Sequence, residues 1–94
     1  METEVSNWDA SEYLDSPEMI KEYINAAIED GSPELLQAAL GDVAKAQGMT
    51  DIAKKANVSR QNLYKTFSTD SHPRLDTIQK VIHSLGLKLK VETL

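Results

Sequence analysis

Apolar residues recur at spacings of three and four over residues 19–44, which is the periodicity of amphipathic helices. The run is interrupted at Gly31 and stops before Gly48. Each half begins with the sequence Ser-Pro-Glu, at residues 16–18 and 32–34, in which the serine can cap a helix and the proline can occupy its first turn. The pattern therefore predicts two successive helices, each opened by Ser-Pro-Glu and each closed by a glycine.

Three shorter amphipathic segments follow. Thr50 and Ser59 are each good N-cap residues, and Gly86 suits the end of a helix because glycine readily adopts a positive φ. These boundaries predict helices over residues 51–56, 59–67 and 74–85, with a polar loop over 68–73.

The period of the pattern changes near the C-terminus. Residues 87–92 alternate between apolar and polar, which is the period of a β-strand. A single strand needs a partner, and the chain offers no other strand. We therefore expect this strand to pair with its copy across a homodimer, an unpaired tail being the alternative.

These elements predict an all-α fold in which residues 16–94 form a single five-helix domain. Ninety-four residues are enough for one domain with a modest core. Residues 1–15 are polar and acidic and lack helical periodicity, so we expect them to form an N-terminal arm.

The charge is distributed unevenly between the two halves of the chain. The formal net charge is −5, but residues 1–49 contain eleven acidic and two basic residues, whereas residues 50–90 contain eight basic and three acidic ones. Such asymmetry favours a nucleic-acid surface on the basic half, although two ordinary solvated faces would also produce it.

Several classes of function lack their sequence signals. The chain has no cysteine and only two histidines, His72 and His83, so we expect neither a metal site nor a cofactor. It contains no glycine-rich phosphate loop and no nucleophile elbow, so we expect no enzyme activity. No apolar stretch is long enough for a membrane span, and no secretory signal follows Met1. We therefore expect a cytoplasmic protein.

Residues 50–67 predict a helix-turn-helix unit. Small and apolar side chains at Ile52, Ala53 and Ala56 would let a second helix pack closely on the first. Asn57 lies where the chain must reverse, and asparagine tolerates the left-handed conformation that such a turn demands. Leu63 and Phe67 would form the inner face of the second helix.

The outer face of that second helix has the side chains that contact DNA. Arginine can pair with guanine and glutamine with adenine, so we expect Arg60 and Gln61 to read bases in the major groove. Other polar residues nearby could contact phosphate, or could form only a solvated face. The complete candidate DNA-binding set is Thr50, Ser59, Arg60, Gln61, Asn62, Tyr64, Lys65 and Arg74.

The chain resembles the Cro and phage-repressor class of helix-turn-helix proteins. The landmarks that match are Ile52-Ala53, Val58-Ser59, Pro73, Leu75, Thr77, Ile78, Ile82, Leu85 and Gly86. The chain departs from the pattern at Asn57, where that class usually has glycine. The resemblance covers about residues 49–92 and implies a repressor-like fold that binds double-stranded operator DNA.

A narrower resemblance extends to residues 13–92. Tyr13-Leu14, residues 24–27 and residues 39–49 are similar to the HigA-like antitoxins. The resemblance implies an antidote that neutralises a RelE/ParE-like (HigB-like) toxin by direct binding and represses the operon that encodes both proteins. A free-standing phage-type repressor without a toxin partner is the alternative.

The acidic N-terminal region is a candidate toxin-binding segment. An RNA-cutting toxin must itself attract phosphate, so its surface would be basic. Aromatic and apolar residues among acids could anchor on such a surface, and here they are Trp8, Tyr13 and Leu14. A surface that only keeps the protein soluble is the alternative, and the face of the first two helices would then be the preferred toxin surface.

Overall fold

The computed structural model describes residues 14–68 and 70–94, and these residues form α-helices without any β-strand. The helices are α2 (Pro17–Asp30), α3 (Pro33–Gln47), α4 (Met49–Ala56), α5 (Arg60–Thr66) and α6 (Leu75–Ser84). The predicted all-α architecture is confirmed for this part of the chain. The candidate residues Trp8 and Tyr13 lie outside the described residues.

The two Ser-Pro-Glu sequences open α2 and α3 in the same way. The Oγ of Ser16 accepts a hydrogen bond from the backbone N–H of Met19 at 3.2 Å, and the Oγ of Ser32 accepts one from Leu35 at 3.2 Å. Gly31 closes α2 with a φ of 84°, a left-handed conformation that favours glycine. The sequence predictions for these two helices are confirmed.

The start of α4 differs from its prediction. Thr50 was expected to cap a helix from Asp51, but α4 begins at Met49, and Gly48 occupies the capping position without a side chain that could bond. The apolar side chain of Met49 is buried in the core, which explains the earlier start. Thr50 is therefore an exposed residue of the first turn of α4.

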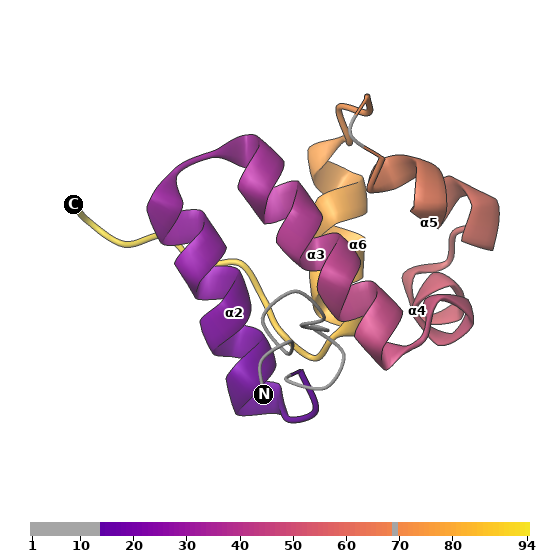
Figure 1. The fold of residues 1–94 in the computed structure, drawn as a ribbon, viewed down its shortest axis with the longest axis horizontal. Coiled ribbons are helices and arrows are strands. Elements are labelled where there is room, and N and C mark those ends of the chain that lie inside the picture. The colour runs from indigo at the N-terminus through magenta and orange to yellow at the C-terminus, as the bar shows by residue number, and fades with distance from the viewer. Residues whose placement is uncertain (1–13, 69) are drawn as a thin grey trace, which may run out of the picture.

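Figure 1 shows α2 at one end of the molecule, α4 and α5 at the other end, and α3 and α6 between them. In agreement with this arrangement, α3 packs against α2, α4 and α6, while α5 packs against α4. Helices α4 and α5, from the basic half of the chain, thus lie at the end of the molecule opposite α2, which comes from the acidic half (Figure 1).

The core consists of two clusters of buried side chains. The first cluster lies among α2, α3 and α6 and contains Leu14, Ile20, Ile24, Leu40, Val43 and Ile82. The second lies among α3, α4, α5 and α6 and contains Ala44, Met49, Ile52, Ala53, Leu63 and Val81. The half-buried side chains of Phe67 and Leu85 pack against both clusters.

Gly41 allows α3 and the end of α5 to approach closely. A Cβ placed at this position would lie 3.2 Å from the Cβ of Phe67 and 3.3 Å from its Cγ. These contacts are tighter than ordinary van der Waals distances, so a side chain at position 41 would displace the ring. Because Gly41 has no side chain, the ring of Phe67 can pack against α3 between the two clusters.

The strand predicted over residues 87–92 is not formed. Leu87 is half-buried and packs against the first cluster, but the side chains of Leu89 and Val91 are 39% and 94% exposed. A strand requires backbone hydrogen bonds to a neighbouring strand, and the described part of this chain supplies none. In the single chain, residues 87–92 therefore form an unpaired tail, which was the alternative expectation.

Tyr23 links α2 to α3 through a hydrogen bond. Its hydroxyl donates to Oδ2 of Asp42 at 2.7 Å. Partial burial raises the pKa of Tyr23 to about 12, and the hydrogen bond to Asp42 and the negative charge of that carboxylate add to the increase. The phenol is therefore favoured over the phenolate in the folded state.

The raised pKa predicts a loss of stability at alkaline pH. Because the folded pKa lies above the ordinary tyrosine value of 10.0, the contribution of Tyr23 is complete below pH 10 and is lost as the pH rises from 10.0 to about 12. Urea unfolding at successive pH values measures this loss. Tyr23→Phe is the control, and it should remove a distinct part of the decline over this range. If both proteins lose stability equally over this range, the titration of Tyr23 is not responsible.

Candidate nucleic-acid interface

The connection between α4 and α5 is a tight turn that reverses the chain. Asn57 adopts the left-handed conformation, with φ 58° and ψ 46°, as its sequence position predicted. The backbone N–H of Val58 donates to the carbonyl of Ala53 at 3.0 Å, which satisfies a free carbonyl at the end of α4. The half-buried side chain of Val58 packs against the second cluster.

Helix α5 is attached to the body of the protein by one fully buried side chain. Leu63 is 0% exposed and belongs to the second cluster, whereas every other residue of α5 is exposed or half-buried. The Oγ of Ser59 accepts a hydrogen bond from the N–H of Asn62 at 3.0 Å and so caps the helix as predicted. The buried side of α5 is therefore narrow, and most of its surface faces solvent.

The structure brings most of the candidate DNA-binding residues together on this exposed surface. Six of them are exposed and lie on α5 or at its N-cap. They are Ser59, Arg60, Gln61, Asn62, Tyr64 and Lys65. Thr50 is exposed on α4, the helix against which α5 packs.

Arg60 and Tyr64 form a pair on adjacent turns of α5. The Nη2 of Arg60 donates a hydrogen bond to the hydroxyl of Tyr64 at 3.3 Å, and its Cζ lies 5.5 Å from the centre of the tyrosine ring. A cation at this distance from an aromatic ring is attracted to it. Because a guanidinium has five N–H donors, this contact leaves donors free for a base or a phosphate.

Arg74 is separated from this group along the chain. It lies immediately before α6, and its Nε forms an exposed ion pair with Oδ1 of Asp76 at 3.3 Å. On α4, the Nζ of Lys55 pairs with Asp51 at 3.1 Å in the same exposed manner. Exposed pairs of this kind are weak, so neither contact prevents the cation from turning to a phosphate.

Gln37 fixes the end of α5 and the loop that follows it, and the sequence pattern did not single it out. Its Nε2 donates to the carbonyl of Thr66 at 2.7 Å and to that of Ser68 at 2.8 Å, with the carbonyl of Ser71 further away at 3.4 Å. One side chain of α3 thus satisfies carbonyls on both sides of the end of α5. The bonds span 29 to 34 residues, so no local sequence signal could reveal them.

Leu14, which the sequence suggested as a toxin contact, lies in the core. Its side chain is 1% exposed and belongs to the first cluster. Its carbonyl accepts a hydrogen bond from Nε2 of Gln47 at 3.3 Å, which holds the segment before α2 against α3. A contact of this side chain with a partner would require it to leave the core.

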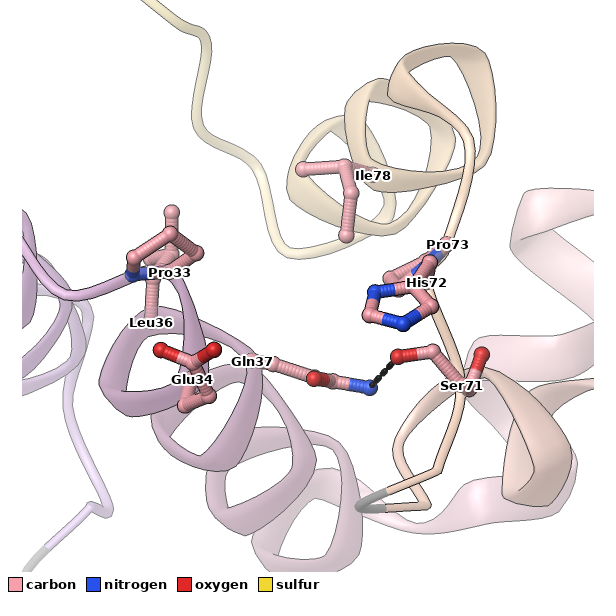
Figure 2. A pocket seen from close by; sticks show the side chains of 8 residues that line it. All are labelled: Pro33, Glu34, Leu36, Gln37, Ser71, His72, Pro73 and Ile78. Carbon is pink, nitrogen blue, oxygen red and sulfur yellow. Dashed lines mark hydrogen bonds between the residues drawn. The ribbon is translucent and has the colours of Figure 1, made fainter.

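A pocket of about 250 Å³ lies between α3 and the loop that leads into α6. Figure 2 shows the residues around it, which are Pro33, Glu34, Leu36, Gln37, Ser71, His72, Pro73 and Ile78.

Among the described residues, no group of three or more histidine, cysteine or acidic side chains could hold a metal ion. None of the described helices is long and apolar enough to cross a membrane.

Comparison with known proteins relates the chain to a protein family and to a bacterial relative. The family described as "Probable addiction module antidote protein" matches residues 4–93 of the chain. An uncharacterized protein of Haemophilus influenzae is 37% identical over 92 residues, which cover 98% of this chain and 95% of the relative. No solved structure matches the chain.

Proposed function

The chain belongs to the addiction module antidote family, and from this premise we propose that it is the antitoxin of a type II toxin–antitoxin module and represses its own operon by binding operator DNA through α5. An antidote of an addiction module implies a toxin as its partner. The proposed toxin is of the RelE/ParE-like (HigB-like) class, and it is neutralised by direct binding.

The exposed polar face of α5 is the observation that carries the DNA-binding part of the proposal. Leu63 is the only buried residue of α5, and Arg60 and Gln61 at its N-terminal end are exposed and can enter a groove. This is the end of the second helix that contacts base edges in a helix-turn-helix protein. Arg60 would contact guanine and Gln61 adenine, and Asn62, Lys65, Ser59 and Thr50 would contact phosphate.

A homodimer is part of the proposal because such operators are commonly two-fold symmetric. Two copies of α5 would lie in successive major grooves, roughly 34 Å apart along one face of the duplex. The body of the protein is acidic, so binding depends on the local basic surface and weakens as salt rises.

Fluorescence anisotropy tests the DNA-binding proposal directly. A labelled duplex from the region upstream of the gene is compared with a scrambled duplex of the same composition at near-physiological salt. We expect Arg60→Ala/Gln61→Ala to lose about 1–3 kcal/mol of discrimination for each bidentate contact removed.

Gln79→Ala/Lys80→Ala is the matched control for this double variant. It also removes one amide and one cation from adjacent exposed helical positions, but on α6. The control should keep the preference of the natural protein for the upstream duplex. Equal binding of the natural protein to both duplexes would refute operator recognition by this chain on its own.

A further inference from the structure

The pocket beside α3 has apolar walls and a charged edge. Leu36 and Ile78 are half-buried and pack against the first cluster, and Figure 2 shows them on facing sides of the hollow. The exposed side chains of Glu34 and His72 also line it, one from α3 and one from the loop before α6. Its volume of about 250 Å³ is below the roughly 300–1,000 Å³ of typical small-molecule sites. It suits one large side chain better than a free ligand.

The surface next to the pocket is apolar and acidic. Residues 22–44 contain five acidic residues and no lysine or arginine. Glu29, Asp30 and Glu34 are exposed around the turn between α2 and α3. Ile28 and Leu35, on either side of the same turn, are each 44% exposed.

This combination of charges selects among the possible occupants. A nucleic acid is disfavoured because its phosphates would meet the exposed carboxylates of Glu29, Asp30 and Glu34. A second copy of the chain is also disfavoured. A two-fold axis through this surface would place the acidic turn of one copy against the acidic turn of the other. A partner with a positively charged surface and an exposed apolar side chain is complementary in both respects.

We propose that this pocket and the adjoining turn between α2 and α3 are the docking surface for the toxin partner. An apolar side chain of the toxin fills the pocket between Leu36 and Ile78, and a lysine or arginine beside it pairs with Glu34. This inference rests on the proposed antitoxin function. It assigns to that function a surface made of α3, the loop before α6 and the turn between α2 and α3, which does not include the N-terminal arm.

Charge reversal at Glu34 tests the electrostatic part. The probe is the purified product of the reading frame adjacent to this gene, titrated into the full chain by calorimetry. We expect Glu34→Lys to weaken binding at least about tenfold. Glu18→Lys is the matched control, because Glu18 is the exposed acid at the same position of the other Ser-Pro-Glu helix start, on α2. The control should bind within about twofold of the natural chain.

Filling the pocket tests the apolar part. His72 lines the pocket and belongs to neither core cluster, so His72→Trp places a larger ring there, and we expect it to weaken binding at least about tenfold as well. His83→Trp makes the same change at an exposed position of α6 outside the pocket lining, and it should leave the affinity unchanged. Thermal unfolding of all four variants verifies that each one is folded.

The outcomes separate this inference from the proposed function. If the natural chain binds the probe and both pocket variants bind equally well, the docking surface is wrong and the antitoxin function stands. If the natural chain does not bind the probe, both are wrong. If Glu34→Lys instead changes the sedimentation of the chain alone from dimer to monomer, a second copy occupies the surface and the inference is overturned.

Discussion

Replacing Leu63 by alanine is expected to lower the free energy of unfolding by about 2–5 kcal/mol. The side chain is 0% exposed, and it is the only residue of α5 that is buried. Its removal leaves a cavity in the second cluster, against Ile52 and Ala53 among others. Because α5 is only seven residues long, it cannot persist as a helix without this anchor. We therefore expect operator binding to fail together with stability.

Thermal unfolding and urea unfolding measure the effect of Leu63→Ala. A domain of this size loses roughly 4–8 °C in Tm for each kcal/mol, so the expected decrease is at least about 8 °C. Leu75→Ala is the matched control, since it makes the same change in a leucine that is 67% exposed at the start of α6. It should cost less than about 1 kcal/mol. Similar losses in the two variants would contradict the role of Leu63 as the anchor of α5.

Asn57→Val is expected to destabilise the protein by about 2–3 kcal/mol through the backbone of the turn. The residue has φ 58°, and a β-branched side chain is strongly disfavoured in this region. Valine also lacks the short polar side chain that makes asparagine tolerant of it. If the chain relieves this strain by opening the turn, α5 leaves its place beside α4. The affinity for operator DNA then falls by more than the loss of folded protein would explain.

Two variants isolate the backbone as the cause. Asn57→Gly keeps the left-handed conformation without strain and should stay within about 1 kcal/mol of the natural protein. Asn25→Val makes the same side-chain change at an exposed position inside α2, where asparagine and valine have similar helix propensities. A large loss in Asn57→Gly, or an equal loss in Asn25→Val, would contradict this explanation.

The sequence predicted the helices best where local signals agree with one another. Three signals indicate the same boundaries for α2 and α3: the Ser-Pro-Glu starts, the apolar spacing and the terminal glycines. Both helices begin and end at these boundaries. At Thr50 a good capping residue competed with the burial of Met49, and burial in the core decided the start of α4. A local capping preference is worth about 1 kcal/mol, which is less than the burial of a large apolar side chain.

The features that the sequence could not predict are those made by distant residues. Leu14 resembled an interface residue because acids surround it in sequence, but its side chain packs among α2, α3 and α6. The bonds of Gln37 join α3 to the end of α5 and to the loop after it, 29 to 34 residues away in sequence, and the pocket beside Gln37 is lined by the same loop. By contrast, the exposed face of α5 follows from the local period of the helix. The assignment of Arg60 and Gln61 to base contacts remains a prediction that the operator experiment tests.

The position of Phe67 and Leu85 has a consequence for how the molecule loses its structure. Both side chains pack against the first cluster and the second, so neither cluster can come apart without exposing surface that the other one buries. We therefore expect the two ends of the protein to share one cooperative unfolding transition. A partner that binds only at one end protects the opposite end from unfolding as well, since binding to the folded state stabilises the whole cooperative unit.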